Sequence, residues 1–134
     1  MALTADKKTE WMEGRDIVFK GAINQKIYAG ALVCAQCVVG GLLFLPATDG
    51  TNKPVIGIAL ESKETGDNQT LLVRTTGVVK LKFSGSAIYP PGSDVYVVDD
   101  ETVTGDASST TNSVVAGKLV KVDDDPNYAW VRIG

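Results

Sequence analysis

Histidine is absent from this 134-residue sequence, which removes the usual proton shuttle near neutral pH and the commonest metal ligand. A Ser-His-Asp triad is therefore impossible. Neither a Gly-x-x-x-x-Gly-Lys-Ser/Thr loop nor a Gly-x-Gly-x-x-Gly loop occurs. We therefore interpret the glycines as residues of turns and bulges and not as a phosphate-binding loop. We expect no enzymatic activity, no cofactor and no bound metal.

Cysteine occurs only twice, as the Cys-x-x-Cys of Cys34 and Cys37. Such a pair can be a redox site or half of a zinc site. Redox pairs work at the start of a helix, where the dipole lowers a thiol pKa, but here the flanking residues ALVCAQCVVG are typical of a strand. No second pair or histidine completes a zinc shell. We therefore interpret both cysteines as buried apolar residues.

The sequence also has no basic stripe and no long apolar run. The formal net charge is −3 and the lysines and arginines are scattered, which disfavours nucleic-acid binding. The longest apolar run, residues 38–46, is far shorter than the roughly 20 residues that a membrane-spanning helix needs. The first 14 residues lack the apolar centre of a secretory signal, so we expect the protein to fold in a cytoplasm.

No segment shows apolar residues at helical spacing over three turns, so little helix is expected. The sequence instead contains about nine short, β-branched segments separated by glycine or proline. This pattern predicts an all-β fold, a small barrel or sandwich. We expect residues 15–134 to form a single domain after a flexible arm of residues 1–14, a charged solvated loop over 63–68, and a bulge or tight bend at Gly77.

Two stretches of the sequence resemble each other. The first runs VIGIALES, a polar turn and TLLVR, and the second runs VVAGKLVKV, an acidic turn and YAWVR. Gly57 matches Gly117 at an offset of 60, and Arg74 matches Arg132 at an offset of 58. Upstream, Gly30 matches Gly92 at an offset of 62. These matches predict an internally duplicated hairpin unit.

Several predicted strands are apolar on both faces, for example residues 56–60, 71–73 and 96–98. A strand with one solvent-exposed face would instead alternate apolar and polar residues. The second face must be covered by another layer of the same chain or by a neighbouring subunit. Because the chain is short, we favour subunit contacts and predict a symmetric homo-oligomer, a dimer or trimer.

Other candidate sites have plainer interpretations. The acidic clusters at residues 99–101 and 123–125 lie in predicted turns, where consecutive carboxylates point in divergent directions, and neither matches a calcium loop. Two tryptophans and four tyrosines on a β-scaffold could instead form a platform that stacks against sugars. A carbohydrate-binding module, such as part of a phage adhesin, therefore stays open as an alternative function.

The order of the motifs GALV, VIGIALE, LLVRTTGVV, PPGSDVYVVDD, VAGKLV and a final VRIG resembles the small capsid decoration, or cement, proteins of tailed phages and prophages. The resemblance covers residues 27–134. It implies a structural protein of the virion that binds the outside of an expanded phage head and bridges its capsomers. The implied partner is the major capsid protein, and the implied location is the capsid exterior after assembly in the bacterial cytoplasm.

The amino-terminal segment is the candidate contact region on this hypothesis. Trp11 has the character of an aromatic interface anchor, and Arg15, Ile17 and Phe19 follow it closely. We expect these four residues to contribute to the contact with the shell. An alternative stays open for Trp11, which can also fold back onto its own domain.

Overall fold

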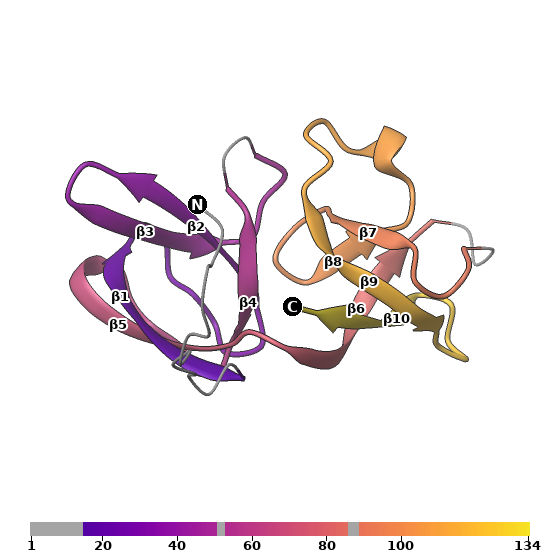
Figure 1. Cartoon of the computed structure of the whole chain (residues 1–134), viewed down its shortest axis with the longest axis horizontal. Helices are drawn as coiled ribbons and strands as arrows, with labels where there is room; N and C mark the ends of the chain where they lie inside the picture. Colours follow the sequence, from indigo (N-terminus) through magenta and orange to yellow (C-terminus); the bar gives the residue numbers. More distant parts are fainter. Residues whose placement is uncertain (1–14, 51–52, 86–88) are drawn as a thin grey trace, which may run out of the picture.

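The computed structural model describes residues 15–50, 53–85 and 89–134 and contains ten strands in two closed barrels (Figure 1). The first barrel, barrel 1, consists of β1 (Asp16–Ile23), β2 (Leu32–Val38), β3 (Gly41–Pro46), β4 (Val55–Ala59) and β5 (Gly66–Arg74). The second, barrel 2, consists of β6 (Gly77–Ser84), β7 (Asp94–Val97), β8 (Thr102–Thr104), β9 (Val115–Val122) and β10 (Tyr128–Ile133). One 3₁₀ turn, η1 (Ala107–Ser109), interrupts barrel 2.

The interior of barrel 1 is built by strand alternation. In β1 the side chains of Ile17 and Phe19 are half-buried, whereas the intervening Val18 is exposed. Phe19 packs against a buried cluster whose largest member is Phe44, with the two ring centroids 6.0 Å apart. The other buried members come from β1, β2, β4, β5 and the loop after β1: Ile23, Ile27, Val33, Ala59, Leu71 and Val73. Period-two alternation therefore places one face of each strand inside the barrel.

Barrel 2 repeats the topology of barrel 1 strand for strand. In each barrel the first strand runs parallel to the third and antiparallel to the fifth. The second strand lies between the third and the fourth, and the fourth pairs with the fifth, in all cases antiparallel. The predicted duplication is thus confirmed and extends to the whole five-stranded unit.

The register of the strands shows which residues are equivalent. Val33 pairs with Gly57 in barrel 1, and Val95 pairs with Gly117 in barrel 2. The β2–β4 ladder shifts register immediately after Val33, and the β7–β9 ladder shifts immediately after Val95. Both barrels therefore carry the same bulge at the same point, which bends the strand as a small barrel requires.

The two barrels share one hydrophobic cluster. Its barrel 2 members are interior residues of that barrel, but its barrel 1 members lie on the outer face of barrel 1: Leu32, Cys34, Leu45, Ala47 and Ile58. In Figure 1 the end of β10 and the turn between β7 and β8 point toward β4. The backbone N–H of Leu32 donates to the carbonyl of Asp100 in that turn at 2.8 Å. One end of barrel 2 is therefore closed by the side of barrel 1.

The all-β fold with little helix is confirmed, with ten strands where about nine were expected. Gly77 does not divide one sheet but begins β6, at the junction between the barrels. Ile58, on an apolar-faced strand, is covered by the second barrel of the same chain, so this strand gives no argument for a subunit contact. The division into an arm and a single domain stays a prediction, as does the homo-oligomer.

Candidate interaction surface

The end of the β2–β3 hairpin, residues 38–41, is the most exposed apolar feature of the described chain. Val39 is fully exposed and Val38 is 42% exposed. Gly40 and Gly41 complete the turn with φ angles of 96° and 140°, which glycine adopts at little cost. A Cβ atom added at either glycine would meet no atom within 4 Å other than those of its chain neighbours, so the turn is not packed against the rest of the barrel at these two positions. We call residues 38–41 the hairpin tip.

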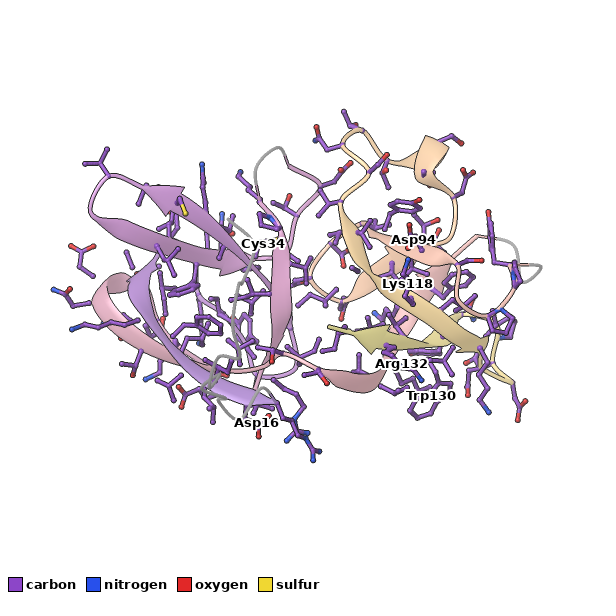
Figure 2. The ribbon with its side chains drawn as sticks, in the orientation of Figure 1. Asp16, Cys34, Asp94, Lys118, Trp130 and Arg132 are labelled. Carbon is purple, nitrogen blue, oxygen red and sulfur yellow. The ribbon has the colours of Figure 1, made fainter. Side chains whose placement is uncertain are left out.

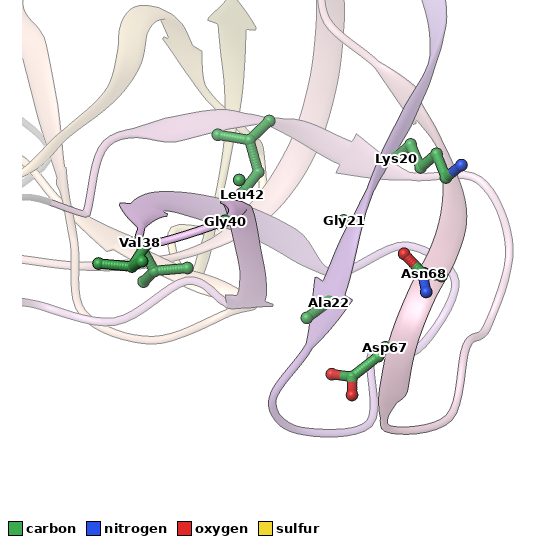
Figure 3. Close-up of a pocket in the computed structure, with 10 residues that line it drawn as sticks. Lys20, Gly21, Ala22, Val38, Gly40, Leu42, Asp67 and Asn68 are labelled. Atoms are coloured by element: carbon green, nitrogen blue, oxygen red, sulfur yellow. The ribbon is translucent and has the colours of Figure 1, made fainter.

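A groove of about 490 Å³ lies beside the hairpin tip (Figure 3). Val38 and Gly40 are on one side of the groove, and Lys20, Asp67 and Asn68 are on the other. The groove is open and carries both charges on its rim. Its shape and mixed polarity suit a contact with a protein surface better than the enclosure of a small molecule.

The equivalent turn of barrel 2 is used for docking within the chain. The turn between β7 and β8 corresponds to the hairpin tip, and its Asp100 carbonyl accepts the hydrogen bond from Leu32 of barrel 1. The β2–β3 ladder is longer, with six paired positions against two in β7–β8. The same hairpin thus serves as a contact element in barrel 2 and projects as a free one in barrel 1.

The four contact residues predicted from the sequence have different environments. Trp11 lies outside the described residues. Arg15 is exposed just before β1, and its carbonyl accepts a hydrogen bond from the Thr75 N–H. Ile17 and Phe19 are half-buried, and Phe19 packs into the interior of barrel 1. Their role as shell contacts stays a prediction. The exposed hairpin tip was not among the predicted residues, although the sequence Val-Val-Gly-Gly marks an apolar turn.

The two cysteines are both free thiols, but only one is buried. Cys34 lies in the cluster between the barrels, where burial raises its thiol pKa. Cys37 is exposed near the end of β2, so the expectation that both are buried is wrong for this residue. In strand β2 the side chains alternate between the two faces, and the barrel contact covers only the face of Cys34.

We expect a thiol reagent to distinguish the two cysteines. Cys37 should react rapidly in the native protein, because its thiol is exposed to the reagent. Cys34 should react only when the protein opens or unfolds. Titration with a chromogenic disulfide should show one fast equivalent under native conditions and two in denaturant. Cys37→Ser should abolish the fast phase, and two fast equivalents would contradict the burial of Cys34.

The acidic clusters stabilise turns. A carboxylate oxygen of Asp99 accepts hydrogen bonds from the backbone N–H groups of Glu101 and Thr102, at 2.9 and 2.8 Å. Glu101 also pairs with Lys82 at 3.0 Å. Partial burial raises the pKa of Asp100, and the negative charges of Asp99 and Glu101 raise it further. Within the described residues, no three potential ligands are grouped so as to hold a metal ion.

The aromatic residues of β10 are tied to neighbouring charges. The indole N–H of Trp130 donates to Asp123 at 3.1 Å and thereby lowers the pKa of that carboxyl. The Lys80 ammonium lies over the ring of Tyr128, 5.0 Å from its centroid, and also pairs with Asp123. Trp130 is half-buried on the outer face of its strand, between the buried Ala129 and Val131.

The outer face of barrel 2 differs from that of barrel 1 at its centre. Leu32 pairs with Ile58 in barrel 1, and the equivalent pair in barrel 2 is Asp94 with Lys118. These two side chains form an exposed ion pair on β7 and β9 (Figure 2). The face that receives a second barrel in barrel 1 is therefore charged in barrel 2.

A search of solved structures finds a crystal structure described as the head fiber gp8.5 N base of bacteriophage phi29, which matches with a TM-score of 0.53. The match covers 89% of this chain and 94% of that chain at 16% identity. The likeness at this identity is one of fold. No model of a known protein family matches the sequence, and no curated protein does. None of the described helices is long and apolar enough to span a membrane.

Proposed function

We propose that this protein is a structural component of a tailed-phage virion that decorates the outer surface of the head and strengthens the expanded shell. The observation that carries the proposal is the fold match to the base of a phage head fiber, which spans both barrels. The resemblance of the sequence motifs to capsid decoration proteins supports the same role independently. The partner in this role is the major capsid protein.

The structure offers a surface suited to such attachment. The hairpin tip presents two exposed valines on a turn whose equivalent in barrel 2 already docks on a barrel wall. Burial of a valine side chain on a partner contributes about 1.5 kcal/mol or more. A single contact of this size is weak, but many copies on one shell, each bridging capsomers, retain the decorating layer and brace the shell through multivalency.

Co-sedimentation with phage heads tests the proposal. The full chain should pellet with expanded empty heads and reach saturation at a fixed number of copies per head, and decorated heads should withstand higher temperature than undecorated heads before the shell disassembles. Val39→Asp should lower the affinity at least about tenfold, because it places a charge where an apolar group is buried.

Val115→Asp is the matched control, since Val115 is 45% exposed on barrel 2 and carries no predicted contact. It should bind as the parent does. Equal loss in both variants would remove the hairpin tip from the contact. A chain that stays in the supernatant with every head preparation would refute the decorating role itself.

A further inference from the structure

Strand β1 has one edge that is unpaired over residues 16–20. On one side β1 pairs with β5 from Asp16 onward, whereas on the other side its ladder with β3 starts only at Ala22, opposite Leu43. Within the described residues, no strand pairs with β1 on that side before Ala22. The groove beside the hairpin tip lies where β1 and the β2–β3 hairpin diverge (Figure 3). The first part of β1 is therefore an open strand edge.

The backbone groups of alternate residues point out from this edge. Val18 lies opposite Leu72, whose carbonyl accepts a hydrogen bond from the Leu60 N–H, on the β4 side, at 3.0 Å. The Val18–Leu72 pair is therefore a non-hydrogen-bonded pair of the β1–β5 ladder. Because bonded and non-bonded pairs alternate in an antiparallel ladder, Asp16, Val18 and Lys20 direct their N–H and C=O groups to the open edge. Each offers a donor and an acceptor to a further strand.

The equivalent edge of barrel 2 differs at its centre. By the shared register, Val18 corresponds to Lys80 of β6. Lys20 corresponds to Lys82, whose backbone N–H donates to the carbonyl of Glu101 at 3.1 Å, so barrel 2 closes its sheet earlier along the strand. Lysine on an open edge is a common device against strand pairing. Barrel 1 instead carries Val18, which is 63% exposed, at the centre of its open edge.

We propose that two copies of the chain form a dimer by pairing their β1 edges antiparallel about a two-fold axis. The edge is self-complementary, because Asp16 and Lys20 carry opposite charges at equal distances from Val18. In pairing centred on Val18, that residue meets its own counterpart, and Lys20 of each copy lies opposite Asp16 of the other. Directly opposite side chains have Cβ atoms about 5 Å apart, so the valine contact and both ion pairs form together. A slip of two residues would place Lys20 opposite Val18 and lose both ion pairs.

The backbone hydrogen bonds and the valine contact stabilise this dimer, and the charges select its register. Asp16 already pairs with Arg74 of its own chain at 2.9 Å, and both side chains are more than a third exposed. Lys20 of the second copy therefore joins an exposed ion pair and adds little stability by itself. The pairing joins the β1–β5 ladders of the two copies into one continuous sheet. It uses the β1 side of the groove and not the hairpin tip, so it is separate from the proposed attachment to heads.

Sedimentation velocity of the full chain, without phage heads, tests the dimer. The parent should reach twice the mass of the chain as its concentration rises. Val18→Lys should weaken dimerisation at least about tenfold, because it brings two ammonium groups together at the axis. Lys80 shows that the fold accepts a lysine at this position, so the variant should keep the circular dichroism spectrum of the parent. Val115→Lys, at a residue of β9 that is 45% exposed, is the control and should dimerise as the parent does.

A charge exchange tests the register. Lys20→Asp should weaken dimerisation about tenfold, because carboxylates then lie opposite each other at both ends of the paired edge. Adding Asp16→Lys to this variant should recover most of the loss, since opposite charges face each other again. A double variant as weak as Lys20→Asp would overturn the antiparallel register, and a parent that sediments as a single copy or as a trimer would overturn the dimer.

A cysteine at the axis locates the contact directly. Hydrogen-bonded partners in an antiparallel pair have Cα atoms about 5.5 Å apart, which is within the range of a disulfide. In a Cys37→Ser background, Val18→Cys should form a covalent dimer under mild oxidation, and Val115→Cys should not. Equal cross-linking of the two variants, or none in either, would overturn the proposal, whatever the binding to heads shows.

Discussion

Gly57→Ala should destabilise the protein by about 4 kcal/mol, the larger of two glycine effects that the duplicated fold predicts. A Cβ at this position would lie 2.2 Å from the carbonyl oxygen of Arg74 and 2.8 Å from a methyl group of Val73. The backbone φ of 152° adds strain for any L-residue. Because the obstructing atom belongs to a neighbouring strand's backbone, a side chain cannot rotate away to relieve the contact.

Gly117→Ala separates the effect of steric crowding from the effect of backbone strain. The equivalent Cβ would lie 2.3 Å from the carbonyl of Arg132, but this residue does not have the strained φ of Gly57. We expect a loss of about 3 kcal/mol from crowding alone. Gly92→Ala introduces backbone strain without crowding, because Gly92 has a φ of 90° and no atom lies within 4 Å of the new Cβ. We expect this variant to lose about 1 kcal/mol of stability. Chemical denaturation of the three variants measures the order, and a Gly117→Ala variant as stable as Gly92→Ala would contradict the close approach.

The same two glycines explain why the duplication was visible in the sequence. Gly57 and Gly117 face an arginine carbonyl at the closing ladder of each barrel, and Gly30 and Gly92 donate equivalent hydrogen bonds to Ala59 and Leu119. Few residue types other than glycine fit the backbone geometry at these four positions, so the sequences of the two copies are identical there. The interior positions accept any apolar residue of suitable volume, as the equivalent Phe44 and Val103 illustrate, and the two copies therefore match less well at these positions.

Other features of the fold could not be predicted from the sequence. The closure of each repeat into its own barrel depends on pairing between strands distant in sequence, such as β1 with β5. Residues 66–68, expected in a solvated loop, begin β5 because Gly66 pairs with Ile23. Their polar composition suits a strand that is exposed at its start. Nor does the sequence reveal that the apolar outer face of β4 meets barrel 2 and not another subunit.

The candidate interaction surface could be predicted only in part from the sequence. Residues near the amino terminus were favoured because of Trp11, but strand alternation turns Ile17 and Phe19 toward the interior. The exposure of Val39 follows from the length of the β2–β3 hairpin, which extends past the end of the barrel. Local composition does not encode how far a hairpin projects.

Ile58→Lys should cost at least about 3 kcal/mol and loosen the contact between the barrels. Ile58 is 7% exposed in the shared cluster, and a lysine there must bury its ammonium without a partner or force the barrels apart. Thermal unfolding should lose cooperativity, because barrel 2 loses the cover of its apolar end. Limited proteolysis should then cut at the junction near Thr76, and small-angle scattering should show a larger radius of gyration.

The structure supplies a matched control in the other repeat. Lys118 occupies the position of Ile58, and Lys118→Ile makes the reciprocal exchange on a surface that no second barrel covers. We expect a change in stability within about 0.5 kcal/mol, as for most surface substitutions. If Ile58→Lys were as mild as Lys118→Ile, the barrels would be independent units that touch without stabilising each other. A large difference would show that one residue position, apolar in the first repeat and charged in the second, decides where a neighbouring barrel packs.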